Sequence, residues 1–311
     1  MKPKITVIDI AKFMNMTPQA IHTQIKVKNI KAYRTPNKIN YLQHEEAREL
    51  LKIKVKPSVI AFELVKGGVG KTSLSFHCAV RASLYGLRCA IIDLDQQSNL
   101  TRAFGINETN TPIMIDVIKK NLSLKDNLIN VSNGIDLLPS SFENAMLNTI
   151  LLINNAPLDM IFKDKIEPLK NDYDLIFIDC PPDLGAAVTA TALASDLIIA
   201  PIEPDKFSLQ GLELTLREIN IISKEYNKEI PVKTLINKFN NKTNLSHQTL
   251  CSLLKNENTS NLLLKTFINS SQEFPNCFDK GISVFETFKK STAKEDIDLL
   301  TRELIEILRI S

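Results

Sequence analysis

Residues 59–72 read Val-Ile-Ala-Phe-Glu-Leu-Val-Lys-Gly-Gly-Val-Gly-Lys-Thr and predict a buried strand, a glycine-rich turn and the start of a helix. Six of the seven residues from 59 to 65 are apolar, which is typical of a strand covered on both faces. Positions 67–70 hold three of the nine glycines in the chain. A turn that brings backbone N–H groups close to phosphate oxygens needs residues without a Cβ atom.

The two residues after the glycines carry the chemistry that a phosphate site requires. Lys71 is expected to place an ammonium group beside the phosphates, and Thr72 a hydroxyl beside Mg²⁺. The helix that begins here adds its positive dipole end. The general pattern G-x-x-x-x-G-K-[ST] fails at one position, because Val65 replaces its first glycine and a second lysine, Lys66, follows. A glycine-rich turn without a ligand is the alternative.

The stretch Lys66-Gly-Gly-Val-Gly-Lys-Thr72 resembles the deviant Walker A motif of the ParA/MinD family of P-loop ATPases. The resemblance implies an ATPase that uses ATP and Mg²⁺, with catalytic roles for both lysines. It implies that Lys66 reaches across a dimer interface to the nucleotide of the other subunit. The residues implied to bind ATP in the loop are Lys66, Gly67, Gly68, Val69, Gly70, Lys71, Thr72 and Ser73.

A second buried strand, residues 88–95, ends in carboxylates and is followed by Gln96-Gln-Ser-Asn99. This segment resembles the family pattern Asp-x-Asp-Pro-Gln-x-Asn, and Gln96 in place of proline predicts a looser turn. By resemblance Asp95 positions or activates the attacking water, and Asp93 supports the Mg²⁺ shell. A carboxylate is needed at this strand end because the carboxyl edge of a parallel sheet faces the phosphates.

A third strand, in Tyr173-Asp-Leu-Ile-Phe-Ile-Asp-Cys-Pro-Pro182, resembles a Walker B strand. The resemblance implies that Asp179 holds Mg²⁺ through water, together with Thr72 and Asp93. A later strand, residues 231–238, carries Asn237 near its end. The resemblance places Asn237 near the adenine, and an ordinary asparagine at a strand end is the alternative.

The N-terminal segment differs from the rest in charge. Residues 1–58 contain 12 Lys or Arg and 4 Asp or Glu, a net charge of +8, whereas the remainder has 26 and 31, a net charge of −5. A basic segment attached to a mildly acidic body suggests a nucleic-acid-binding arm.

Two short helices are predicted in this segment, residues 6–14 and 18–26, and Thr17-Pro18 is a typical start for the second. A hairpin around residues 35–38 and a helix over 43–54 follow. The segment resembles a MerR-like or excisionase-like winged helix-turn-helix. A small dimerisation module with a solvated basic face is the alternative. The candidate DNA contacts are Gln19, His22, Thr23 and Lys26 on the second helix, and Arg34 and Lys38 on the hairpin.

The rest of the chain predicts further α/β elements: helices over 113–120, 142–152 and 207–226, and strands within 134–139, 194–204 and 265–269. The last helix, residues 292–310, is expected to pack on the sheet through an apolar stripe. Its many acidic residues argue against a MinD-like membrane anchor. The predicted stripe is Ile297, Leu300, Leu304, Ile307 and Leu308, and candidates for nonspecific DNA contact are Lys289, Lys290 and Lys294.

Composition supports a cytoplasmic location. The five cysteines are scattered without a C-x-x-C pair, as in a reducing compartment. No apolar run approaches the roughly 20 residues needed to span a bilayer, and no signal-peptide core follows Met1.

We therefore expect a three-layer α/β P-loop NTPase with a mostly parallel sheet over residues 57–311, preceded by a winged helix-turn-helix over 1–56. The resemblance implies a ParA-like partitioning ATPase, located on the nucleoid, that dimerises with ATP and binds DNA. A ParB-like partner would stimulate its slow hydrolysis, and the N-terminal module would repress its own operon. The alternatives are an ATP-switched transcriptional regulator and a MinD-like positioning ATPase. A nitrogenase-iron-protein-like reductase is disfavoured, because no cysteine is suitably placed for a shared cluster.

Overall fold

An eight-stranded sheet forms the centre of the molecule in the computed structural model, which describes residues 4–107, 110–287 and 289–309. The strand order is β11-β10-β9-β4-β8-β5-β7-β6, and every neighbouring pair is parallel except β6 with β7. The expected mostly parallel α/β fold is confirmed. The strands are β4 (Ser58–Phe62), β5 (Cys89–Asp93), β6 (Ile129–Ser132), β7 (Ile135–Leu138), β8 (Leu175–Asp179), β9 (Leu197–Ile202), β10 (Val232–Phe239) and β11 (Leu263–Asn269).

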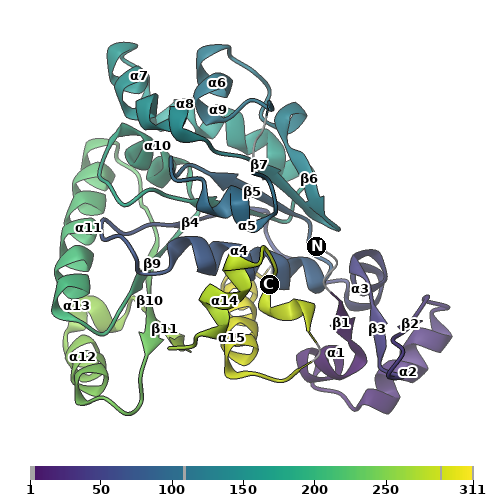
Figure 1. The fold of residues 1–311 in the computed structure, drawn as a ribbon. Coiled ribbons are helices and arrows are strands. Elements are labelled where there is room, and N and C mark those ends of the chain that lie inside the picture. The colour runs from purple at the N-terminus through teal and green to yellow at the C-terminus, as the bar shows by residue number, and fades with distance from the viewer. Residues whose placement is uncertain (1–3, 108–109, 288, 310–311) are drawn as a thin grey trace.

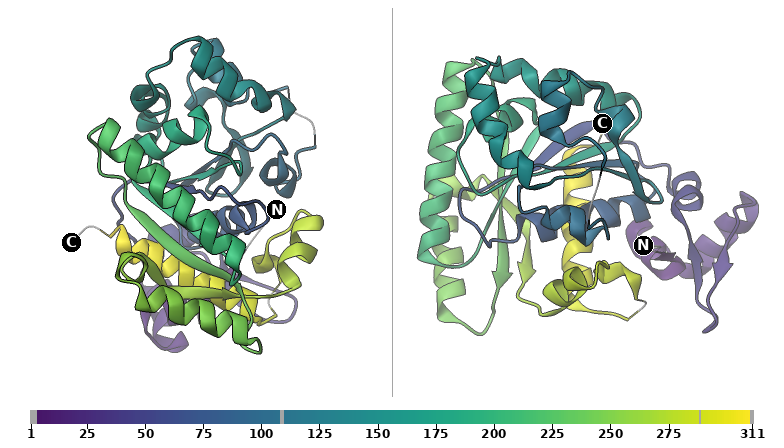
Figure 2. Two further views of the ribbon diagram at one scale, coloured as in Figure 1. Left: turned by 90° about the vertical axis from the view of Figure 1, so that its left-hand side faces the viewer. Right: turned by 45° about the horizontal axis from the view of Figure 1, so that its top comes forward.

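Helices cover both faces of this sheet, as Figures 1 and 2 show. Successive side chains of a strand point to opposite faces, so Ile60 and Phe62 of β4 enter one hydrophobic cluster while Val59 and Ala61 enter the other. The first face is covered by α4 (Lys71–Leu84), α5 (Asn99–Ala103), α14 (Glu273–Asp279), η4 (Val284–Glu286) and α15 (Thr292–Ile307).

The second face is covered by a larger set of helices, most of them short. Within the described part of the chain, no helix is both long enough and apolar enough to cross a membrane. The set is α6 (Met114–Lys119), α7 (Leu147–Ile153), α8 (Leu158–Ile161), α9 (Lys163–Ile166), η3 (Glu167–Asn171), α10 (Ala186–Ala194), α11 (Lys206–Glu225) and α12 (Asn244–Lys255). The short turns η1 (Lys125–Asn127) and η2 (Phe142–Met146) lie between α6 and α7 in the chain, and α13 (Glu257–Ser260) follows α12.

The N-terminal segment folds as a small module with its own three-stranded antiparallel sheet, in the order β1-β3-β2. As expected, Thr17 caps the second helix, because its side chain accepts a hydrogen bond from the backbone N–H of Ala20 at 3.2 Å. The strand β1 was not predicted. The elements are β1 (Ile5–Thr6), α1 (Val7–Met14), α2 (Pro18–Val27), β2 (Tyr33–Arg34), β3 (Asn40–Leu42) and α3 (His44–Leu51).

Two predictions about helices are wrong, one on where α3 ends and one on which side of α15 is buried. The helix expected over residues 43–54 ends at Leu51, because Lys52 adopts a left-handed conformation (φ 46°). The chain then runs extended, so that Val55 forms a β-bridge with Arg309 and is buried. In α15, Ile307 is 42% exposed rather than buried, and Ile305 packs inward in its place. Ile307 is the last residue of α15, and its side chain faces away from the sheet.

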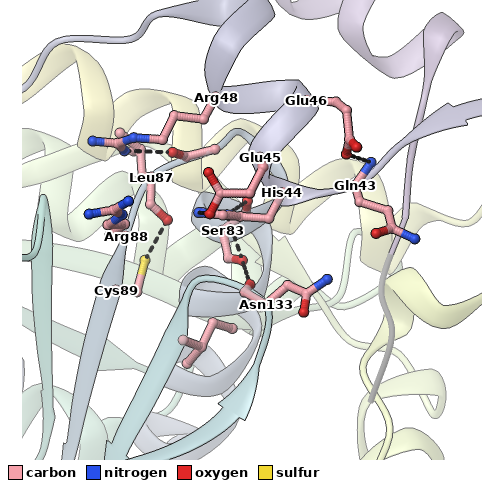
Figure 3. A network of polar contacts seen from close by, with 12 residues as sticks. Gln43, His44, Glu45, Glu46, Arg48, Ser83, Leu87, Arg88, Cys89 and Asn133 are labelled. Atoms are coloured by element: carbon pink, nitrogen blue, oxygen red, sulfur yellow. Dashed lines mark hydrogen bonds and ion pairs between the residues drawn. The ribbon is translucent and has the colours of Figure 1, made fainter. Parts of the chain in front are cut away.

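The module is packed directly against the body through α3 (Figure 3). His44 Nδ1 lies 2.8 Å from the carbonyl oxygen of Ser83, which can only accept, so Nδ1 carries the proton. The imidazole fits where Gly134 has no side chain, since a Cβ atom there would lie 2.2 Å from the ring. Burial lowers the pKa of His44, which keeps the ring neutral.

Arg48 forms the second contact of α3 with the body. Its Nη1 donates to the carbonyl oxygen of Gly86 at 2.8 Å and to Asp174 Oδ2 at 2.6 Å. The backbone approach is close, because a Cβ atom on Gly86 would lie 2.4 Å from Arg48 Cα. Ser83 and Gly86 flank the C-terminal end of α4, whose first residue is Lys71. The module therefore rests on the far end of the helix that begins at the glycine-rich loop.

A further contact joins α1 to the same helix end. The rings of Phe13 and Tyr85 have centroids 4.2 Å apart. Arg302 of α15 donates to the Tyr85 hydroxyl at 3.1 Å and to the carbonyl oxygen of Lys12 at 3.2 Å. One hydrophobic cluster includes Ile10 of the module and Leu84 of the body. The module and the body therefore share a continuous core.

Candidate active site

The glycine-rich loop, residues 63–70, connects the central strand β4 to α4. Gly68 and Gly70 have φ angles of 78° and 94°, in the left-handed region that favours glycine. A Cβ atom on Gly70 would also lie 2.3 Å from the side-chain nitrogen of Asn237. The sequence pattern therefore corresponds to a backbone shape that other residues would not adopt easily.

Lys71 is buried at the start of α4, with 6% of its surface exposed. Its Nζ donates to the carbonyl oxygens of Leu64 at 2.9 Å and Lys66 at 3.1 Å. Burial lowers the pKa of Lys71, and the nearby carboxylate of Asp179 acts in the opposite direction. The loop thus folds around an ammonium group whose partners are backbone carbonyls of the loop.

A cavity of about 740 Å³ opens over this loop. Its floor contains Lys71, Thr72 and Ser73, and Asp95 lies in its wall. The cavity is also lined by the end of β10 and by residues between 268 and 279, which include Phe274 and Phe278. Its lining therefore combines polar groups of the loop with apolar and aromatic groups, as a nucleotide would require.

Asp179, at the end of β8, is the most unusual side chain in this region. It is buried, with 1% of its surface exposed, and neither carboxylate oxygen has a hydrogen-bond partner among the residues that the structure describes. Burial and the neighbouring Asp93 raise its pKa well above the ordinary value, while Thr72 and Lys71 oppose that rise. A buried carboxylate without partners is costly unless a cation binds it. Its oxygen donors suit Mg²⁺.

Asp93, one strand away on β5, is in contrast fully engaged. Its carboxylate accepts from the backbone N–H of Asp95 at 3.1 Å, and from the backbone N–H and hydroxyl of Thr101 at 2.9 and 2.7 Å. Burial raises the pKa of Asp93 to about 7. The geometry makes Asp93 a support for the loop that carries Asp95.

The loop after Asp93 is held by hydrogen bonds despite its missing proline. Asp95 Oδ1 accepts from the backbone N–H of Gln97 at 2.9 Å, and the Ser140 hydroxyl donates to the Asp95 carbonyl at 2.8 Å. Arg102 donates to the carbonyl of Gln97 and, at 3.1 Å, to Asn99 Oδ1. The half-buried carboxylate of Asp95 lies on the cavity wall.

Asn237 also lines the cavity, although its side chain is occupied. Its Nδ2 donates to the carbonyl oxygen of Val69 at 2.7 Å, and its Oδ1 accepts from the backbone N–H of Lys238 at 2.9 Å. Lys238 Nζ donates to the carbonyl oxygen of Gly68 at 2.8 Å and to Glu203 at 2.7 Å. The pair braces the glycine-rich loop. The sequence does not reveal this role of Lys238, because Lys238 and Gly68 are 170 residues apart in the chain.

Comparison with known proteins agrees with this geometry. Residues 57–232 match a protein family described as an AAA domain. The chain is 31% identical over 221 residues to the ParA family protein of Mycoplasma pneumoniae. The matched region is 64% of this chain and 77% of that protein. The chain belongs to the ParA family.

Two further ParA-related proteins extend the match. The virulence plasmid ParA family protein pGP5-D of Chlamydia trachomatis is 29% identical over 257 residues, 81% of this chain and 95% of that protein. A crystal structure of a plasmid partition protein from Borrelia burgdorferi, bound to AMPPNP, has a TM-score of 0.67 at 26% identity and covers 81% of this chain and 100% of its own. The P-loop ATPase fold of the ParA family is therefore established for this chain.

Lys66, the lysine expected to act across a ParA dimer, points to its own chain. Its Nζ donates to both carboxylate oxygens of Asp205 at 3.0 and 2.8 Å and to the Ser208 hydroxyl at 2.9 Å. Pro204-Asp205 ahead of a helix is a recognisable cap signal, and Asp205 caps α11. That signal does not reveal the contact with Lys66, which lies 139 residues away in the chain.

The residues that sequence reasoning proposed for DNA contact lie on α2 and on the hairpin of β2 and β3. On α2, Gln19, Thr23 and Lys26 are exposed and His22 is half-buried. On the hairpin, Arg34 and Lys38 are exposed, and Arg34 Nε donates to the Lys38 carbonyl at 3.4 Å. The structure thus leaves these side chains accessible, and their contact with DNA remains a prediction.

Proposed function

We propose that this protein is a ParA-type ATPase that partitions plasmid or chromosomal DNA. The observation that carries the proposal is the buried, unpartnered carboxylate of Asp179 beside a glycine-rich loop of ParA sequence. A site built to leave such a carboxylate without protein partners is ready to receive a hydrated cation and the phosphates that accompany it.

ATP would occupy the cavity over the loop, with its phosphates against residues 66–73 and its base toward Asn237 and residues 268–279. Thr72 and Asp179 would hold Mg²⁺, and Asp93 would support the Mg²⁺ shell from behind rather than bind the metal directly. The metal ion, when bound, neutralises charge on the phosphates. Lys71 would exchange its bonds to the loop carbonyls for phosphate oxygens, and Asp95 would orient the attacking water.

ATP binding would drive dimerisation, with Lys66 acting on the nucleotide of the second subunit. The dimer would bind DNA on the nucleoid within the cytoplasm, and a ParB-like centromere-binding protein would stimulate hydrolysis that is slow without it. The N-terminal module would bind an operator through α2 and the hairpin and repress its own operon. Its net charge of +8 over residues 1–58 supports contact with phosphate backbones.

A second function is favoured by one observation, the direct packing of the module on the end of α4. In this alternative the protein is a transcriptional regulator, and ATP switches the affinity of the module for one operator without a role in segregation.

DNA binding with ADP, ATP and AMPPNP, measured on random and upstream DNA with light scattering for mass, separates the two functions. The partition reading expects an ATP-dependent dimer that coats random DNA. Deleting residues 1–56 should remove operator binding and leave nucleotide-dependent binding to random DNA. Binding confined to one upstream site with every nucleotide would instead favour the regulator.

A further inference from the structure

Lys66 is held by one face of α11. Asp205 and Ser208, three positions apart, bind its ammonium group, and Ser208 is fully buried. One turn later Gly211 lets the helix approach closely, because a Cβ atom there would lie 3.3 Å from Lys66 Cβ. Thr215 completes the face, since its hydroxyl accepts from the backbone N–H of Val65 at 3.3 Å. Residues at this spacing share one side of a helix.

We propose that this face, which we name the Lys66 cradle (Asp205, Ser208, Gly211 and Thr215), stores Lys66 within its own subunit and so opposes ATP-dependent dimerisation. The inference rests on the proposed function, in which Lys66 must reach the nucleotide of a second subunit. The cradle sets the protein concentration at which the dimer forms.

The hydrogen bonds of the Lys66 ammonium group support storage rather than a passing contact. A lysine ammonium has three N–H donors, and Lys66 has three acceptor atoms within 3.0 Å. Each of these bonds must be broken before the group can donate to a phosphate elsewhere. Ser208 in turn donates to Asp205 Oδ2 at 3.0 Å and fixes the carboxylate.

The neighbouring lysine of the site is held differently. Lys71 donates to carbonyl oxygens of its own loop, which a phosphate can replace without any movement of α11. Lys66 is bound to a different element, so its release frees the front of the loop from α11. Each of the two subunits must release its own Lys66. The free energy of dimerisation therefore includes the breaking of two sets of cradle contacts.

Asp205→Asn is the substitution that tests the cradle. Asparagine keeps a side-chain oxygen for the helix cap, which Asp205 provides by accepting from the backbone N–H of Ser208 at 2.9 Å, but removes the charge that binds Lys66. Because the ion pair is about 28% exposed, its strength per subunit is modest. With two subunits, we expect the concentration for half-dimerisation to fall roughly tenfold.

Glu213→Gln is the matched control, since Glu213 is an exposed carboxylate on the same helix α11, outside the Lys66 cradle. It should leave the dimerisation concentration within about twofold of wild type. Lys66→Ala, alone or combined with Asp205→Asn, should fail to dimerise at any concentration tested, because the proposed dimer requires Lys66.

The experiment measures mass by analytical ultracentrifugation with AMPPNP and Mg²⁺, and acylation of the Lys66 amine by mass spectrometry in nucleotide-free protein. The expected result is faster acylation of Lys66 and dimerisation at lower concentration in the Asp205→Asn variant. If Asp205→Asn dimerises with AMPPNP at the same concentration as wild type, the cradle is overturned and the proposed function still stands. Failure of every variant to dimerise overturns both, and unchanged acylation overturns the storage of Lys66 directly.

Discussion

Replacing Gly86 by alanine should detach the N-terminal module from α4. A Cβ atom at this position would lie 2.4 Å from both the backbone N and Cα of Arg48 and 2.8 Å from its Cβ. Backbone atoms cannot rotate away, so α3 must move by about 1 Å to restore ordinary contact. That movement breaks the hydrogen bond of 2.8 Å from Arg48 to the Gly86 carbonyl and disturbs the neighbouring bond from His44 to Ser83.

Gly105 provides a matched control. Both glycines have a φ angle of 81°, so both alanine variants lose about 1 kcal/mol from the strained backbone. Around Gly105, no atom of residues 4–107, 110–287 or 289–309 lies within 4 Å of the added Cβ. Gly86→Ala adds the lost contacts of α3, which contribute about 2–4 kcal/mol. We discount the Arg48–Asp174 ion pair in this sum because its side chains are 37% and 21% exposed.

Urea unfolding followed by far-ultraviolet circular dichroism measures the difference, since the chain has no tryptophan for fluorescence. Trypsin cleavage near Lys52 and Lys54 reports release of the module separately. Gly86→Ala should lose about 3–5 kcal/mol of unfolding free energy and Gly105→Ala about 1 kcal/mol. Equal losses, with equal rates of cleavage, would refute the docked arrangement of α3.

Three other perturbations test the site and its electrostatics. Asp179→Asn should raise the unfolding free energy of nucleotide-free protein by about 1 kcal/mol in urea titrations, because it removes a buried carboxylate without a cation. The same variant should weaken Mg²⁺-dependent AMPPNP binding. A loss of stability would contradict the claim that burying this carboxylate costs free energy. Asp95→Ala should retain AMPPNP binding but slow phosphate release by about 100-fold, and normal turnover would remove Asp95 from the mechanism. Burial lowers the pKa of His77 to about 4, so the unfolded chain binds more protons between pH 6.5 and 4 and wild type loses stability as the pH falls through that window. In His77→Gln, the fall in unfolding free energy between pH 6.5 and 4 should be smaller by roughly 3 kcal/mol than in the exposed control His247→Gln. If the two variants have the same dependence of stability on pH, His77 is not a buried neutral ring.

The sequence predicted the elements whose signals are local. The glycine-rich loop, the strand-end carboxylates Asp93 and Asp179 and the cap at Thr17 depend on neighbours within a few residues. The helix α10 was missed because it is Ala-Ala-Val-Thr-Ala-Thr-Ala-Leu-Ala, which is buried nearly all round and has no amphipathic period. The edge strand β6 and the two-residue β1 are too short to produce an alternating pattern.

The contacts that complete the site could not be predicted, because they join distant parts of the chain. Asn237 and Lys238 bind the glycine-rich loop from β10, and Asp205 binds Lys66 from the start of α11. Each depends on the strand order β10-β9-β4, which places these segments side by side. The early end of α3 has the same origin, because Val55 is drawn to the C-terminal segment by burial.

Calorimetric titration of the purified chain with AMPPNP, with Mg²⁺ and then with EDTA, examines the nucleotide site itself. The structure predicts one nucleotide for each chain, tighter binding with Mg²⁺, and loss of binding in the Lys71→Ala variant. Absence of binding in the wild-type chain, or equally tight binding in Lys71→Ala, would contradict the assignment of this loop as the ATP site.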